Sequence, residues 1–474
     1  MKNESIKTNL SYQIIYRILT IITPLITSPY LSRVLGVEKL GVFSATYAQA
    51  NYFILIAMLG VEYYGNRTIA VCNSDKELKV KFWEIYYVQA IASILAILGY
   101  CLTIINLSPE RKIYAACQGI WIVAAGLDIN WFFFGTQQFK LTVTRNIIIK
   151  VATIIGIFLF VHKSDDLVKY ILVMAGGMLI NQLVMWYFLL KQIGITRVSM
   201  SDVIPHVKPM LKLFIPVIGL SIFQIMDKTM VDWLSDETNS GCYYNADRLM
   251  NIPLGVITAM STVMLPRLAK EFHKKSCDVA VKLLTKSAEL TISLACAVGF
   301  GIGAISFEFV PLFFGKEFNL CVVLILGLTP AIIVKSMEEY IRSQYLIPTR
   351  QDNIYIKAVF IAAGVNIIAN YYFILKFGAL GAVIGTNIAE ITLFIIQAWK
   401  VKDKLNFFKI FKKNSFYFAL GIIMFVVIRL FCNMTNYGNF ISVLISIMLG
   451  GLIYVTGIII YANININSIY HLKK

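Results

Sequence analysis

Charged residues interrupt the long apolar stretches of this 474-residue sequence. The cationic ones are Arg17, Lys228, Arg248, Lys335 and Arg429. Moving such a charge to the centre of an apolar layer costs roughly 3 kcal/mol on membrane-insertion scales, so these side chains normally face a wet interior. The chemistry open to a group of them is the binding of an anion.

Acidic residues stand beside some of these cations. Asp227 precedes Lys228 and Asp247 precedes Arg248, so a site that also includes Arg17 is mixed in charge but net cationic. Further carboxylates that could bind a coupling ion are Glu62, Asp128, Glu338, Glu339 and Glu390. Alternatively, these carboxylates lie at helix ends and are simply solvated.

Local pairing offers a structural role for several of the charges. Pairs with i,i+4 spacing on one helix are Lys228 with Asp232, Lys335 with Glu339 and Glu338 with Arg342. Arg17 could instead extend its guanidinium to a membrane surface. We favour the structural role for Lys335 and Arg429.

The elements that position these residues are predicted to be membrane-spanning helices. Of the sequence, 58% is hydrophobic and 15% charged, whereas soluble domains are about a quarter charged. A span needs about 20 mostly apolar residues, and the runs show no strand-like alternation. Fourteen spans are predicted, at 11–34, 41–64, 83–105, 113–135, 146–162, 167–190, 212–234, 243–266, 284–306, 318–341, 356–376, 378–400, 415–432 and 440–462.

Lys and Arg in the connecting segments predict the orientation. They concentrate in the segments that are cytoplasmic if the N-terminus is inside, which is the bias of inner loops. Both termini are therefore expected in the cytoplasm, and the first span is expected to be retained rather than cleaved. The net charge of +17 then faces anionic lipid, which leaves no reason to expect a nucleic-acid partner.

Weak internal matches indicate two related halves. Gly41 and Arg67 recur 200 residues later as Gly241 and Arg267, and "NIIIK" at 146–150 recurs as "NIYIK" at 353–357, an offset of 207. Six spans per half make the repeats parallel, as in transporters with a substrate cavity between the halves. The predicted parts are a lobe at 1–190, a linker at 191–212, a lobe at 213–400, and a basic loop with two last helices at 401–474.

The position of a residue in the repeat indicates which charges could line the cavity and which prolines could be hinges. Arg17, Lys228 and Arg248 come from spans one, seven and eight, which a two-lobed transporter would place around its cavity. Pro24 and Pro29 in the first span, and Pro216 in the seventh, each remove a backbone donor and bend a helix. The bend is either static or a hinge, and a place in the first helix of each repeat favours a hinge.

The sequence offers little for catalysis, metals or cofactors. Eight cysteines form no CxxC pair and four histidines are scattered, so no metal or redox site is expected. No predicted loop exceeds about twenty residues, which leaves no room for the extramembrane domain that membrane enzymes usually carry. We therefore expect a protein that is not an enzyme and carries no nucleotide-binding motif.

Several stretches resemble the oligosaccharide repeat-unit flippases, the Wzx or polysaccharide-transporter family, whose superfamily includes the MATE drug exporters and the lipid II flippases. They are residues 11–70, "LDINWFFFGTQQFKLTVTRNIIIK", "YYNADRLMNIPLGVI", "MLPRLAKEF" and "ILKFGALGAVIGTNIAE". The chain departs from that pattern at Phe134, where members often have Gln, and at Thr136 to Gln138, near which they often have an acidic residue. The departure weakens any role for the tip of the fourth span.

The resemblance implies a fold and a function. It implies that an undecaprenyl-diphosphate-linked oligosaccharide moves from the cytoplasmic to the outer leaflet of a bacterial plasma membrane, for capsule, O-antigen or similar glycans, with alternating access and no ATP. Arg17, Lys228 and Arg248 would then hold the diphosphate. Coupling to protons or sodium ions stays open, as does partnership with a glycan polymerase and chain-length proteins. Two alternative functions also stay open: an ion-coupled drug or metabolite exporter of the same superfamily, and a membrane glycan polymerase.

Overall fold

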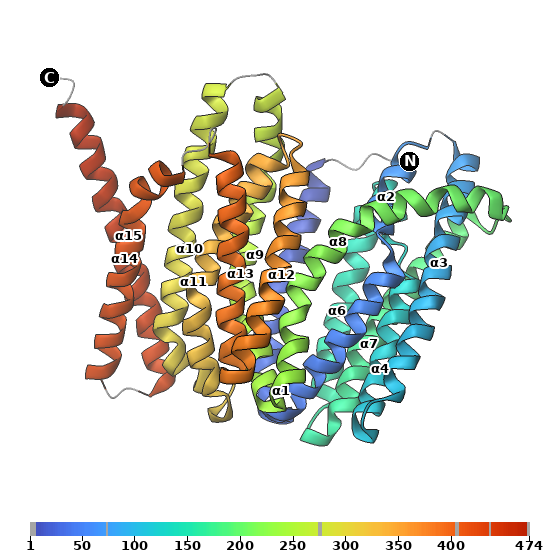
Figure 1. Cartoon of the computed structure of the whole chain (residues 1–474), viewed down its shortest axis with the longest axis horizontal. Coiled ribbons are helices and arrows are strands. Elements are labelled where there is room, and N and C mark those ends of the chain that lie inside the picture. The colour runs from blue at the N-terminus through green and yellow to red at the C-terminus, as the bar shows by residue number, and fades with distance from the viewer. Residues whose placement is uncertain (1–5, 73, 274–276, 403–406, 436–437, 472–474) are drawn as a thin grey trace. The chain divides into compact units, whose positions relative to one another are not determined.

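The computed structural model describes residues 6–72, 74–273, 277–402, 407–435 and 438–471. Every regular element in these ranges is a helix (Figure 1). The described residues divide into two compact units, residues 1–232 and 233–474. The boundary assigns nearly all of the seventh predicted span to the first unit, whereas the repeat pattern counts that span with the second half. The four-part division made from the sequence stays a prediction.

The first unit is a bundle of long helices joined by short turns. Helices α3, α4, α6 and α7 run side by side in it, and α1 packs on α3, α4 and α6 (Figure 1). Its elements are α1 Ile6–Met58, α2 Val61–Ala70, α3 Asp75–Ile105, α4 Pro109–Gly126, α5 Asn130–Gly135, α6 Phe139–Phe160, η1 Ser164–Asp166, α7 Leu167–Ile193 and α8 Met200–Leu234.

Local sequence signals set the helix ends. The Ser74 hydroxyl accepts a hydrogen bond from the Glu77 amide at 3.2 Å and caps α3, and Pro109 begins α4 at a position that needs no amide donor. Gly60 separates α1 from α2 with φ of 71°. A Cβ at Gly60 would lie 3.0 Å from the Phe214 nitrogen, so the residue also allows α8 to approach.

The second unit contains the remaining helices. Helix α11 packs on α9, α10 and α13, α12 pairs with α13, and the last pair, α14 and α15, packs against α10 (Figure 1). The elements are α9 Glu237–His273, α10 Cys277–Phe313, η2 Lys316–Phe318, α11 Leu320–Ile341, the π-helical turn η3 Arg342–Leu346, α12 Asp352–Phe377, α13 Ala379–Val401, α14 Phe407–Met434 and α15 Asn439–His471.

The all-helical membrane class is confirmed, and each predicted span overlaps a helix. Within the described ranges, eleven helices are long and apolar enough to cross a bilayer, or twelve if the bent α8 is one span. The prediction of fourteen counts two more. Its first two spans are separated by the non-helical residue Gly36, and they are counted together as one apolar stretch, Ile22–Ala70. Its eighth lies in α9, which carries polar residues such as Asn245, Asp247 and Arg248 and is not among the eleven.

Helix α1 leaves helical geometry in the gap between the first two predicted spans, and the bend predicted at Pro24 and Pro29 stays a prediction. The sole residue with non-helical dihedral angles in α1 is Gly36, at φ 77° and ψ 174°, while Pro24 and Pro29 lie inside helical backbone. Glycine reaches this conformation without the steric penalty that a Cβ brings. In α8, the axes of Met200–Gly219 and Gln224–Leu234 differ by 56°, just after Pro216. Whether these bends move stays a prediction.

A repeated turn relates the two units. The Gln138 amide bonds to the Phe133 carbonyl at 2.8 Å, and the Gln351 amide bonds to the Leu346 carbonyl at 2.8 Å. Gln137 and Arg350 both have positive φ, at 59° and 58°. The side-chain amide of each glutamine donates to the threonine two residues earlier, at 3.0 Å in both turns.

The repeated turn gives a second offset for the internal match. Gln138 and Gln351 each precede the first residue of a long helix, α6 and α12, and lie 213 residues apart. This is six residues more than the offset of 207 between "NIIIK" and "NIYIK", which stays a prediction.

Candidate functional site

The predicted cavity cations lie in different places of the described structure. The Arg17 side chain lies outside the described residues. Lys228 is half-buried on α8 in the first unit, next to the buried Asp227. Arg248 is half-buried on α9 in the second unit, with its guanidinium 5.8 Å from the centre of the Tyr244 ring. Their grouping around one cavity stays a prediction.

Several bonds attach helix α8 to its own unit near Lys228. The hydroxyls of Tyr52 and Thr229 lie 3.2 Å apart, which joins α1 to α8. Asp232, considered above as a partner for Lys228, forms a bidentate ion pair with Arg111, and both N–O distances are 3.0 Å. The carboxylate of Asp232 therefore serves to connect α8 with the start of α4.

The other end of α8 is attached through a buried histidine. His206 Nε2 lies 2.8 Å from Glu84 Oε2 on α3, and His206 Nδ1 lies 2.7 Å from the Tyr64 hydroxyl on α2. Lys81 donates to the same Glu84 oxygen at 2.6 Å. Both ends of α8 are thus bonded to the first unit, on either side of the bend.

Asp247 has a local partner on α9. Its Oδ1 atom and its backbone carbonyl accept hydrogen bonds from the Asn251 amide at 2.8 and 2.9 Å. The carboxylate is half-buried one residue before Arg248. Side chains of both signs therefore lie on the same turn of α9, and their place in a cavity stays a prediction.

A partly buried polar cluster, here called the Asp128 cluster, lies among α4, α5, α6 and α7. It consists of Asp128, Asn130, Arg145, Asn146, Asn181 and Gln182. Asp128 accepts hydrogen bonds from the Asn130 amide at 2.9 Å and from Gln182 Nε2 at 3.0 Å. The buried Arg145 donates to the Asn181 carbonyl at 3.0 Å and to the side chains of Asn130 and Asn146 at 2.9 and 2.6 Å.

Aromatic residues are linked to the Asp128 cluster through Trp131 and Gln89. Phe82, Trp131 and Phe132 pack together in the core of the first unit. Trp131 donates its indole N–H to Gln89 at 3.1 Å, and Gln89 donates in turn to the Asp128 carbonyl at 2.9 Å. Glu62, also considered from the sequence, is exposed in the first turn of α2. The low polarity around the cluster strengthens its hydrogen bonds.

A second polar cluster, here called the Glu338 cluster, lies among α11, η3, α12 and α13. It consists of Lys335, Glu338, Glu339, Arg342, Tyr355, Glu390 and Gln397. Glu338 accepts a hydrogen bond from Gln397 Nε2 at 2.9 Å and lies 3.6 Å from the Arg342 Nε atom, so the predicted Glu338–Arg342 pair is confirmed. Arg342 also pairs with Glu339 and lies over the Tyr355 ring.

The predicted pair of Lys335 with Glu339 is replaced by a contact between helices. Lys335 Nζ lies 3.8 Å from the buried Glu390 on α13, while Glu339 pairs with Arg342. Arg429, for which a structural role was favoured, pairs with Glu308 of α10 at 2.8 Å and lies over the Phe307 ring. This pair attaches α14 to the second unit.

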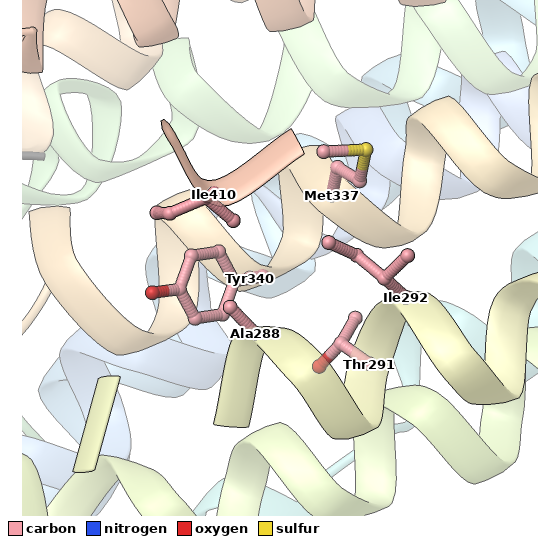
Figure 2. Close-up of a pocket in the computed structure, with 6 residues that line it drawn as sticks. All are labelled: Ala288, Thr291, Ile292, Met337, Tyr340 and Ile410. Carbon is pink, nitrogen blue, oxygen red and sulfur yellow. The ribbon is translucent and has the colours of Figure 1, made fainter. Parts of the chain in front are cut away.

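The small pocket of Figure 2 has a mostly apolar lining. It lies among α10, α11 and α14 and is lined by Ala288, Thr291, Ile292, Met337, Tyr340 and Ile410. Tyr340 points its hydroxyl at the Leu284 carbonyl, 3.0 Å away, which leaves an apolar wall. Among the described residues, no group of three His, Cys, Asp or Glu side chains could hold a metal ion.

Sequence reasoning missed Arg145, Gln182 and Gln397. A signal was present, because Asn181 and Gln182 are adjacent amides inside an apolar span and Gln397 follows Asn387 and Glu390 in another. In hydrocarbon such groups need partners, so they mark contacts between helices. The identity of the partners depends on how the helices pack.

The long apolar helices define an all-helical integral membrane protein. The chain is similar to the lipid II flippase MurJ in its inward closed conformation, with a TM-score of 0.73 over 97% of this chain and 99% of that one, at 16% identity. It is also similar to an inward-facing MATE multidrug transporter, with a TM-score of 0.59 over 81% of this chain and 98% of that one, at 11% identity. These likenesses establish a MurJ-like and MATE-like fold.

The family follows from the sequence. The chain belongs to the polysaccharide biosynthesis protein family, whose model matches residues 6–272, more than half of its length. A Shigella dysenteriae protein named "Putative O-antigen transporter" is 22% identical over 384 residues, 80% of this chain and 96% of its own length. "Probable low-salt glycan biosynthesis flippase Agl15" of Haloferax volcanii is 23% identical, over 68% of this chain and 67% of its own.

Proposed function

We propose that this protein moves undecaprenyl-diphosphate-linked oligosaccharides from the cytoplasmic to the outer leaflet of a bacterial plasma membrane, for capsule, O-antigen or exopolysaccharide assembly. The observation that carries the proposal is the match to the O-antigen transporter relative along nearly its whole length, inside a family of polysaccharide biosynthesis proteins. The fold also supports the proposal, because it is similar to that of a protein described as a lipid II flippase.

In this proposal Arg17, Lys228 and Arg248 hold the diphosphate while the lipid tail stays in the bilayer. Lys228 and Arg248 are half-buried, which leaves their charged heads partly accessible, and each follows an acidic residue that offsets part of its charge. A diphosphate binds such cations through charge-assisted hydrogen bonds. The carboxylates then hold the cations in place when no substrate is bound.

The membrane potential supplies part of the driving force. One charge moved through 100 mV is worth about 2.3 kcal/mol, so a headgroup with about two negative charges leaves a negative-inside cell with roughly 4 to 5 kcal/mol of assistance. Both termini lie on the cytoplasmic side in this scheme, as the Lys and Arg distribution predicts. The protein performs no covalent chemistry, and its partners are the lipid-linked glycan, the bilayer, and a glycan polymerase with chain-length proteins.

The test is a transport assay on two classes of molecule. The full chain is reconstituted into liposomes, and transbilayer movement of a fluorescent undecaprenyl-diphosphate oligosaccharide is followed beside efflux of a cationic dye. Protein-dependent movement of the lipid alone supports the proposal. Export of the dye with a static lipid would instead favour the drug exporter that shares the fold, and elongation of the glycan would favour a polymerase.

A further inference from the structure

We propose that the first half of α8, Met200–Gly219, lies in the headgroup layer of the membrane and binds anionic phospholipid there. The bound lipid fixes the position of this segment and so sets the rate of the proposed transport. The dependence of that rate on lipid rests on the proposed function, whereas lipid binding does not. The occupant is a phospholipid of the surrounding leaflet and not the transported glycan lipid.

Helix α8 is longer than one bilayer crossing requires. Its 35 residues extend over about 52 Å, while the hydrocarbon core of a bilayer is about 30 Å thick. The axis of Met200–Gly219 differs by 56° from that of Gln224–Leu234. Figure 1 shows the start of α8 running across one end of the first unit, while its later part runs along the other helices. The first half of α8 is therefore inclined toward the plane of the membrane.

One side of this segment is attached to the first unit. Val203 and Met210 are buried in the hydrophobic core of that unit. His206 lies on the same side of the helix and is bonded to Glu84 and Tyr64, as described above. These contacts fix the rotation of the segment about its own axis, and they determine which side chains face outward.

A second side of the segment is apolar and exposed. Met200, Ile204, Leu211 and Ile215 follow one another at spacings of four, seven and four residues, which places them in one stripe along the helix. Each of these residues exposes between 44 and 62% of its surface. A continuous apolar stripe is unfavourable in water, so this side needs an apolar covering.

A third side, next to the apolar stripe, is basic. Lys208 and Lys212 are exposed and lie one turn apart, and the residues before the helix add the exposed Lys191 and Arg197. Asp202 is the only acidic residue in this half of α8. A lysine stem can extend from an apolar layer while its ammonium group reaches a phosphate. An apolar stripe flanked by lysines is typical of helices that lie in the interface between lipid and water.

The charge of this surface favours anionic phospholipid as the occupant. The Lys and Arg distribution predicts that this end of the first unit faces the cytoplasm. Anionic lipids give the cytoplasmic leaflet a negative surface potential, which attracts basic segments. A partner protein would have to match both the stripe and its basic flank, whereas the headgroup layer presents hydrocarbon and phosphate side by side.

Helix α8 also connects this surface with the proposed substrate site. Beyond the bend, the same helix carries Asp227 and Lys228. Lipid that binds the first half holds its tilt, and thereby the angle between that half and the part that carries Lys228. Loss of anionic lipid removes this restraint, so we expect transport to slow.

Photo-crosslinking of the full chain in liposomes tests lipid binding without transport. A benzophenone amino acid is placed at Ile204 on the stripe, or at the exposed Asp202, which lies nearly opposite on the helix and is the matched control. The liposomes contain phosphatidylglycerol and phosphatidylcholine in equal amounts. We expect phospholipid adducts at Ile204 and few at Asp202, with phosphatidylglycerol enriched several-fold. Equal adducts at both positions, or crosslinks from Ile204 to a second copy of the chain in place of lipid, overturn the proposal.

Lysine variants test the role of charge, with the benzophenone kept at Ile204. We expect Lys208→Gln/Lys212→Gln to lose the enrichment of phosphatidylglycerol while adducts persist, because the apolar stripe is intact. Lys282→Gln/Lys286→Gln removes two exposed lysines of the same spacing from α10 and is the matched control. Equal enrichment in the two double variants overturns the role of the lysines. Displacement of the phospholipid adducts by added undecaprenyl diphosphate overturns the assignment to phospholipid.

A transport assay tests the dependence on lipid. We expect the parent to move the fluorescent glycan lipid several-fold more slowly in phosphatidylcholine liposomes than in the mixed liposomes, and Lys208→Gln/Lys212→Gln to be slow in both. A parent rate that does not depend on anionic lipid overturns the link between this segment and transport. No movement in any liposomes, with the adducts at Ile204 intact, would refute the proposed function and leave the lipid-binding segment standing.

Discussion

At the scale of single residues, partners on other helices decide what a buried charge does. Asp232 and Lys335 illustrate this. The sequence offered each of them an i,i+4 partner, and the structure pairs Asp232 with Arg111 of α4 and Lys335 with Glu390 of α13. The Arg429 pair shows the same rule, since Glu308 lies on α10. Helix spacing therefore identifies candidate charges, whereas packing selects their contacts.

Arg145 provides a test at this scale. Its three hydrogen bonds to α5, α6 and α7 are each worth roughly 0.6 kcal/mol in a membrane protein, so we expect Arg145→Leu to lower the free energy of unfolding by about 2 kcal/mol. Thermal unfolding in detergent measures this, with the exposed Arg197→Ala as the control for charge loss. Equal unfolding temperatures for the two variants would show that the bonds contribute nothing.

At the scale of elements, breaks in the helices depend on glycine as much as on proline. The sequence correctly predicted where the helices lie, because long apolar runs identify them. The predicted gap between the first two spans contains Gly36, where α1 leaves helical geometry, but no prediction kept Pro24 and Pro29 in helical backbone. Nor did it predict the two similar turns with positive φ at Gln137 and Arg350. Dihedral angles at single residues follow from packing that composition does not encode.

Gly60 tests the junction of α1, α2 and α8. Alanine there would be held at φ 71° with its Cβ against the backbone of α8, so we expect Gly60→Ala to destabilise the protein by about 1 to 2 kcal/mol. Gly176→Ala is the matched control, because its Cβ would meet no atom within 4 Å, and it should stabilise α7 by roughly 0.5 to 1 kcal/mol. Chemical unfolding in detergent compares the two, and a Gly60→Ala protein as stable as the parent would contradict this view of the junction.

Pro216 tests whether the bend of α8 is a hinge. If the bend moves during transport, restoring the missing backbone hydrogen bond should stiffen it, and we expect Pro216→Ala to slow glycan-lipid movement several-fold while binding of the lipid is unchanged. Pro205→Ala, near the start of the same helix, is the control. Equal rates for Pro216→Ala and the parent would assign the proline a static role.

At the scale of the whole molecule, membrane class and family are established by different kinds of observation. Composition and apolar runs predicted an all-helical membrane protein, and the MurJ-like and MATE-like fold confirms it. The family match then assigns the chain to polysaccharide biosynthesis. The buried glutamines were beyond sequence reasoning, because an amide in an apolar span shows that a partner exists without showing which one.

The account depends on one claim above all, that the chain carries a lipid-linked glycan past the bilayer core through cationic residues. The most direct test is the transbilayer rate of a fluorescent undecaprenyl-diphosphate oligosaccharide in liposomes containing the full chain, Lys228→Ala, Arg248→Ala, Arg17→Ala, or the exposed control Arg197→Ala. We predict rapid movement with the parent and the control, and at least a tenfold slower rate with each of the other three. Equal rates in all folded variants, or no movement with any of them, would contradict the account.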